Sequence, residues 1–197
     1  MSWLTWNNWP LFFVGAAMIV AAVIDGWKLK VPNWLTLPLI LSGWVLGILH
    51  SCGALTPSTG VGGIGGSLVA TALGFFLLFP VYAIGGMGAG DVKMQMGFGA
   101  WIGAFYPFWS ALGIVLWAFC LGVLIGGIIA AVMIVARGKY GQNLAHARLI
   151  LSELFSPAGL GEAGKRATAR RPQWHKLPYG IPLCLGFISY LIYLHGF

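Results

Sequence analysis

The sequence contains little charge, and negative charge is especially scarce. Of its 197 residues only 8% are Asp, Glu, Lys or Arg, and 4 acidic residues stand against 11 basic ones. Hydrophobic residues make up 59% of the chain, and the mean hydropathy is +0.87. So little charge excludes a soluble domain with a large core. We expect an integral membrane protein.

Paired cysteines are also lacking. The three cysteines, Cys52, Cys120 and Cys184, stand alone, with no Cys-x-x-Cys spacing. An odd number of isolated cysteines supports neither a zinc ribbon nor a disulfide framework. We therefore expect them to fill apolar space in helices, and we expect neither a metal nor a cofactor.

Long apolar stretches are abundant, and they predict the fold. A spanning helix needs about 20 mostly apolar residues, and six apolar stretches are candidates, of which the fourth is short. They are residues 10–24, 34–49, 67–84, 92–105, 109–136 and 177–193. The predicted fold is therefore all-α, a polytopic membrane protein with about six transmembrane helices that form a single domain over residues 1–197.

The basic residues give this topology a direction. Lys28 and Lys30 follow the first predicted helix, Lys93 follows the third, and the remaining eight lie in a polar loop at about 137–176. Under the positive-inside rule these three connections are cytoplasmic and both termini lie outside. We expect the basic loop, with a weakly amphipathic stretch at 143–155, to contact anionic lipid of the bilayer rather than nucleic acid.

Asp25 and Asp91 are the chain's only aspartates, and this topology places both at the cytoplasmic edge. An ionisable residue in a membrane segment is a functional candidate, because its burial costs roughly 2.5–3.5 kcal/mol. Local structural roles are the alternatives. Asp25, which we expect to end the first helix, could pair with Lys28. Gly90 or Asp91 itself could cap the fourth helix, whose dipole favours negative charge.

A converging pair of carboxylates could share one proton. At about 4 Å and an effective dielectric of 20, two like charges repel by about 4 kcal/mol, so one carboxylate is ionised and the other protonated. Aspartic proteases use this asymmetry to activate water and polarise a peptide carbonyl without metal. A proton-coupled membrane transporter or channel is the competing class, since membrane aspartates also relay ions. A purely structural membrane subunit is a third.

Two motifs carry a family resemblance. The segment Gly88-Ala89-Gly90-Asp91-Val92-Lys93, followed by Gly97, Gly99, Trp101 and Gly103, resembles the GxGD signature of type IV prepilin peptidases. Asp25, followed by Val31-Pro32-Asn33 and Thr36, resembles the first aspartate motif of that family, and residues 177–182 resemble the start of its last helix. The resemblance runs from about residue 24 to residue 186 in order and spacing.

This resemblance implies a membrane aspartic endopeptidase of the inner (cytoplasmic) membrane. Such an enzyme removes the basic leader of prepilin-like substrates, which carry an apolar helix, at the cytoplasmic face and typically after a glycine. By matching position, Asp25 and Asp91 would be the catalytic pair. Gly88 and Gly90 would place Asp91 and let the backbone approach the substrate strand. The other matching residues expected to shape the site are Lys93, Pro32 and Asn33.

The chain departs from the larger members of the family in one connection. Those members carry a zinc-binding cytoplasmic domain between the first two helices and also methylate the new pilin N-terminus, whereas only residues 26–33 lie there in this sequence. We therefore expect the small, peptidase-only form that serves Flp/Tad-type pili. Archaeal preflagellin peptidases share the same motifs.

Pairs of glycines with small-x-x-x-small spacing recur along the predicted helices. The pairs are Gly43/Gly47, Gly99/Gly103 and Gly122/Gly126. This spacing usually indicates close packing between helices of one chain, and less often a homo-oligomer.

Overall fold

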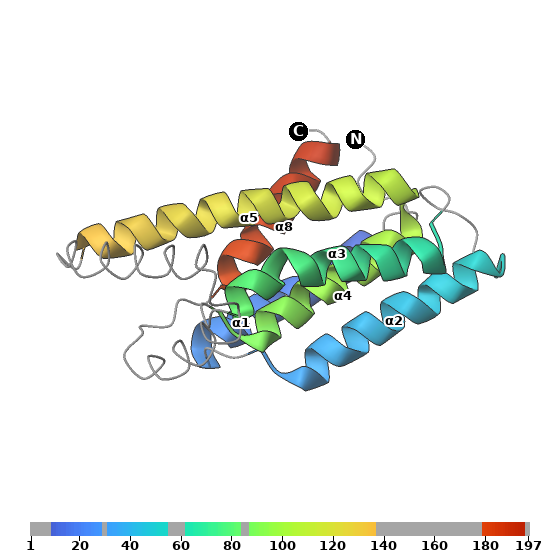
Figure 1. Ribbon diagram of the computed structural model, residues 1–197, viewed down its shortest axis with the longest axis horizontal. Helices are drawn as coiled ribbons and strands as arrows, with labels where there is room; N and C mark the ends of the chain where they lie inside the picture. Colours follow the sequence, from blue (N-terminus) through green and yellow to red (C-terminus); the bar gives the residue numbers. More distant parts are fainter. Residues whose placement is uncertain (1–8, 29–30, 55–61, 84–86, 137–178, 196–197) are drawn as a thin grey trace, which may run out of the picture.

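A computed structural model describes residues 9–28, 31–54, 62–83, 87–136 and 179–195, and every regular element in these ranges is a helix. Figure 1 shows most of the described helices lying roughly along one axis and the last, near the C-terminus, crossing them at a steep angle. The described helices number six. They are α1 (Trp9–Lys28), α2 (Asn33–Ser51), α3 (Ile64–Ala83), α4 (Ala89–Phe105), α5 (Phe108–Ala136) and α8 (Gly180–His195). The all-α prediction is confirmed. The basic loop at 137–176, with its amphipathic stretch, lies outside the described residues.

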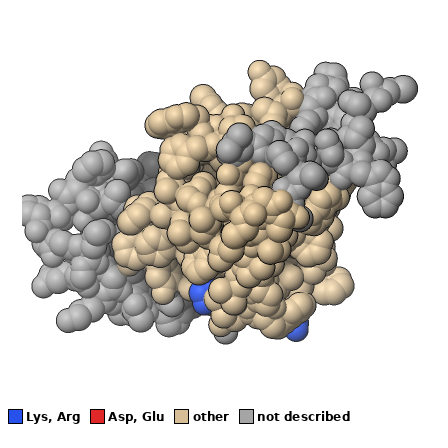
Figure 2. All heavy atoms as spheres, turned by 90° about the vertical axis from the view of Figure 1, so that its right-hand side faces the viewer, with Lys and Arg blue, Asp and Glu red and all other residues tan. Residues whose placement is uncertain are grey.

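Four of these helices are long and apolar enough to cross a membrane. They are α1, α2, α3 and the Phe108–Met133 part of α5. The other two, α4 with 17 residues and α8 with 16, extend about 25 Å at 1.5 Å per residue, slightly less than a hydrocarbon core of about 30 Å. Figure 2 views the bundle from its right-hand end in Figure 1, where the described residues in view are almost all uncharged.

The first helix is longer than the sequence predicted. Sequence analysis ended it before Asp25, but α1 continues through Lys28, so Asp25 lies inside the helix. The reason is that Asp25 and Lys28 are compatible with a helix, and the nearest proline is Pro32, which disfavours helical geometry at Val31. Pro32 itself has extended dihedral angles, and its carbonyl accepts the amides of Leu35 and Thr36, so it starts α2.

Helix α4 is the centre of the bundle and contacts each of the other five described helices (Figure 1). Its glycines let neighbouring backbones approach closely. A Cβ at Gly99 would collide with the carbonyl of Ala70 in α3, and one at Gly103 would collide with that of Gly66. The small residues of α4 therefore allow close contact between this helix and its neighbours.

The glycines of the other two pairs also pack against other helices of the same chain. Gly43 lies against Ala100 of α4, and Gly122 lies against Leu183 of α8. The prediction of close helix packing is confirmed for all three pairs. A homo-oligomer stays a prediction, and these glycines do not supply its surface.

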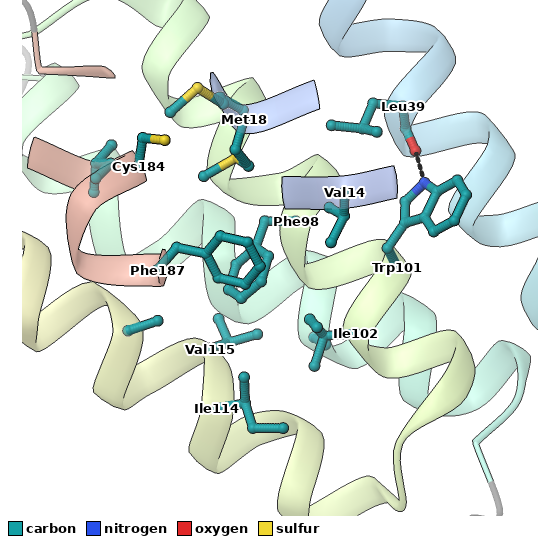
Figure 3. Packing of buried hydrophobic residues seen from close by; sticks show 14 of the residues in the cluster. Val14, Met18, Leu39, Phe98, Trp101, Ile102, Ile114, Val115, Cys184 and Phe187 are labelled. Atoms are coloured by element: carbon teal, nitrogen blue, oxygen red, sulfur yellow. Dashed lines mark hydrogen bonds between the residues drawn. The ribbon is translucent and has the colours of Figure 1, made fainter. Parts of the chain in front are cut away.

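Large apolar side chains fill the space between α1, α4, α5 and α8 (Figure 3). Phe98 of α4 meets Phe187 of α8 edge to face, with ring centroids 4.2 Å apart. On the α2 side, the indole N–H of Trp101 donates to the carbonyl of Leu39 at 3.0 Å. This packing fixes the rotation of α4 about its axis, and thereby the direction in which Asp91 points.

The cysteines follow the prediction only in part. Cys184 is buried in the core beside α1, as expected (Figure 3). Cys120 is half-buried. Cys52 is exposed and lies just after the end of α2, because the apolar run of that helix stops at residue 49 and the chain turns there.

The two ends of the bundle differ in character. The last turn of α1 and the first turns of α2, α4 and α8 share one end, which holds Lys28, Lys93 and both aspartates. At the opposite end, aromatic rings gather: Trp9 lies 5.5 Å from Phe105, centroid to centroid. The two lysines therefore mark the end that carries the aspartates, as the predicted topology requires.

Candidate active site

Asp25 is held by the beginning of another helix. Its side chain is 3% exposed, and its Oδ2 accepts a hydrogen bond of 2.8 Å from the backbone N–H of Gly180, the first residue of α8. The first amides of a helix have no partner inside it and carry the positive end of its dipole, so a carboxylate is favoured there. Lys28 forms no ion pair with Asp25 among the contacts described, and this alternative is not supported.

Asp91 occupies the first turn of α4 and is 4% exposed. Sequence analysis expected Gly90 or Asp91 to cap this helix. The structure instead has Gly88 as the N-cap, and the Oδ2 of Asp91, three residues on, reaches back to the N–H of Gly88 at 3.3 Å. The Oδ1 of Asp91 is buried without a hydrogen-bond partner. The helix-start role therefore uses only one of its two carboxylate oxygens.

The structure brings the two aspartates together. Asp91 lies close enough to Asp25 to experience its charge, although the residues are 66 positions apart on different helices. Tyr179 lies close to Asp91: burial and the negative charge of Asp91 raise the pKa of its hydroxyl, which stays protonated. The next residue, Gly180, binds Asp25. Gly180 and the residue before it thus lie near both aspartates.

The sequence predicted no role in the site for any of residues 177–182. Gly180 has one because of its missing side chain as well as its amide. A Cβ at this position would lie 3.0 Å from both Cβ and Oδ2 of Asp25. The signal for this role was present in the glycine that follows Tyr179, but the sequence does not say which carboxylate it meets.

The glycines of the GxGD turn have roles inside the protein. A Cβ at Gly90 would lie 2.8 Å from the carbonyl oxygen of Val31, and one at Gly88 would lie 3.3 Å from Oδ2 of Asp91. Sequence analysis assigned the open side of Gly90 to the substrate strand. In the structure this space is occupied by Val31, from the connection between α1 and α2. Gly90 therefore brings the two aspartate motifs together.

A polar contact near the surface also joins α4 to the start of α2. The ammonium of Lys93 donates to the side-chain oxygen of Asn33 at 2.9 Å, joining α4 to the first residue of α2. Both residues had been predicted to shape the site, and the structure pairs them. Together with Pro32, which starts α2, this contact fixes the segment that lies against Gly90.

The Lys93–Asn33 contact should contribute modestly to stability. Because it lies near the surface, a double-mutant cycle of Lys93→Met and Asn33→Ala should give a coupling energy of about 0.5–1 kcal/mol in the free energy of unfolding. Reversible unfolding in mixed detergent micelles would measure it. A coupling energy near zero would show that the contact does not hold the two helices together.

Two further buried polar atoms were not assigned a role by sequence analysis. Gln95, one helical turn after Asp91, is 2% exposed and its Nε2 has no described partner. Thr36 of α2, 1% exposed, has an unpartnered Oγ1. An amide in the middle of an apolar helix, four residues after an aspartate, was the available signal for Gln95.

Within the ranges that the structure describes, no three His, Cys, Asp or Glu side chains group closely enough to hold a metal ion.

Fold and site define a class: a polytopic helical membrane protein whose polar centre is a pair of buried aspartates. Within that class the chain belongs to the type IV leader peptidase family, whose sequence profile matches residues 12–129 and so covers both aspartates. The family resemblance noted in the sequence is confirmed.

Individual relatives agree with this family. The prepilin leader peptidase/N-methyltransferase of Aeromonas salmonicida (strain A449) is 28% identical to the chain, over 68% of this chain and 43% of that protein. The protein of the same name from Aeromonas hydrophila is 27% identical over the same shares. The chain thus spans less than half the length of these relatives. No solved structure matches it.

Proposed function

We propose that this protein is a membrane-embedded aspartic endopeptidase that cleaves the basic leader from prepilin-like substrates at the cytoplasmic membrane face. The observation that carries the proposal is the buried pair Asp25 and Asp91, each held by a backbone amide at the start of a helix. Family membership supports the reaction class, and the names of the relatives support the substrate. The lysines at the same end support the membrane face.

The backbone amides determine where the shared proton can reside. An oxygen that accepts an N–H hydrogen bond offers a lone pair, so Oδ2 of Asp25 and Oδ2 of Asp91 both act as acceptors. The unpartnered Oδ1 of Asp91 is then the position on this residue for a proton or for the attacking water. The helix starts thus orient the carboxylates and leave one oxygen ready for the reaction.

Hydrolysis then proceeds by general acid–base chemistry. The ionised carboxylate takes a proton from water as the water oxygen attacks the scissile carbonyl carbon, while the protonated carboxyl gives its proton to the carbonyl oxygen. When the tetrahedral diol collapses, the C–N bond breaks and the leaving amine takes the proton held by the first carboxyl group. The second carboxylate takes a proton back from a hydroxyl of the diol as the new C=O bond forms. The pair returns to its starting state with one shared proton.

A direct test combines the purified protein in lipid nanodiscs with synthetic prepilin-like peptides. Each peptide carries a basic leader, a glycine at the expected cut and an apolar helix, and mass spectrometry locates the cleaved bond. A peptide with a neutral leader is the matched control. Cleavage of no peptide would contradict the proposal and favour the transporter alternative, which proton-flux measurements in the same nanodiscs would examine.

Chelators should leave this activity unchanged, because the proposed water is activated by carboxylates and not by a metal. The measurement is the cleavage rate of the best peptide with and without EDTA. A loss of cleavage that added zinc restores would contradict the two-aspartate mechanism.

A further inference from the structure

An apolar groove runs along the outside of the bundle between α1 and α8. Its volume is about 450 Å³. One stripe of α1 and one stripe of α8 line it, with residues repeating at three and four positions as on a single helix face. The lining residues are Ile19, Ala22, Val23, Gly26 and Trp27 of α1 and Ile181, Cys184, Leu185 and Ile188 of α8.

The groove begins at the aspartate site. Gly26 is the neighbour of Asp25 on α1, and Ile181 follows Gly180, whose amide binds Asp25. From Gly26 it follows α1 back to Ile19, about 10 Å at 1.5 Å per residue. One end of the groove is therefore level with the carboxylates, and the other points toward the middle of the bundle.

We propose that this groove holds the first turns of the substrate's apolar helix, and this rests on the proposed function. A peptide bond that reaches Asp25 must continue into an apolar helix within the membrane, and the groove is an apolar surface whose lining begins one residue from Asp25. Val23 and Leu185 are 48% and 43% exposed, so they remain open to an incoming helix. Ala22, which is 7% exposed, lies deeper, and its small side chain lets that helix approach closely.

The volume fits side chains of a packed helix and not a whole helix. Helices pack with axes 8–10 Å apart by inserting the ridge of one between residues of the other. Two or three apolar side chains from one face of the substrate helix would fill the groove in this way, while the rest of that helix faces lipid. A lipid acyl chain is the competing occupant.

Filling the groove tests the proposal. Val23→Trp and Leu185→Trp should raise the KM for a peptide with leader and apolar helix on the order of tenfold, as expected when a packing site is overfilled. The kcat for a short peptide, which keeps the leader and the cut but lacks the helix, should stay at the parent value. Leu41→Trp and Val45→Trp are the matched controls, because these α2 residues are 54% exposed and lie outside the groove.

A photocrosslinking residue distinguishes the occupants. Benzoylphenylalanine in place of Val23, in an Asp91→Asn background, should capture the helix-bearing peptide, whereas the same residue in place of Val45 should not. Labelling of lipid alone at position 23, or equal KM values for groove and control variants, would overturn the groove while cleavage by the parent enzyme leaves the proposed function intact. If the parent cleaves neither peptide, the proposed function fails, and the groove proposal fails with it.

Discussion

Replacing Asp25 or Asp91 with asparagine should lower peptide cleavage by roughly 10³-fold while the protein still folds. An asparagine keeps the volume of aspartate, and its oxygen can still accept the amide of Gly180 at position 25 or that of Gly88 at position 91. It cannot take up or release a proton in the working range of pH. Cleavage rates per folded molecule, with folded protein measured by size-exclusion chromatography, would give the result.

A control separates the loss of a proton carrier from the loss of a buried polar group. Thr71 of α3 is buried, donates to the carbonyl of Ser67 at 2.7 Å, and takes no part in the proposed site. Thr71→Val should lower stability and leave the cleavage rate per folded molecule near that of the parent. The double variant of Asp25 and Asp91 should be no slower than either single variant, because the two act as a unit. Near-normal turnover by either single variant would show that its aspartate is structural.

A side chain at position 180 should have the second large effect. The Cβ of Gly180→Val would lie 3.0 Å from the Cβ and Oδ2 of Asp25, so the carboxylate or the start of α8 must shift. Displacing a catalytic group by a fraction of an ångström to 1 Å costs about 10²-fold in rate. We expect kcat to fall by about this factor with little change in KM, and Gly180→Ala to give a smaller loss.

Gly127 of α5 provides the control, because a Cβ there would meet nothing within 4 Å. Gly127→Val places the same side chain in a helix of the same bundle and should retain the parent kcat. If Gly180→Val also cleaves at the parent rate, then the amide of Gly180 does not position Asp25. An increase in KM with kcat unchanged would instead assign Gly180 to substrate binding.

The sequence predicted the helices well because each is an apolar stretch bounded by polar or glycine-rich residues. It placed the end of α1 too early. Asp25 and Lys28 are polar but compatible with a helix, and the first residue that disfavours helical geometry strongly is Pro32. It predicted Asp25 and Asp91 as the candidate site residues because charge is so scarce in this chain that each aspartate is conspicuous.

The sequence could not show what surrounds those aspartates. A glycine in a motif indicates that something approaches closely, but not whether the neighbour is substrate or the protein's own backbone. Gly90 illustrates this, because the structure fills its open side with Val31. Likewise, Lys93 and Asn33 were separate residues of two motifs until the fold brought them within 2.9 Å. Such pairings depend on how α4 is rotated, and that rotation is set by core contacts such as that between Phe98 and Phe187.

The bond between Gly180 and Asp25 also has a consequence for biosynthesis. The two residues are 155 positions apart, so the ribosome has released nearly all the described helices before Asp25 can meet its partner. Until then, Asp25 lacks the amide that orients it, whereas Gly88 and Asp91 lie within one turn of each other and need no distant segment. The nascent chain therefore enters the bilayer with an incomplete centre, and Asp25 gains the amide that orients it only when α8 is added.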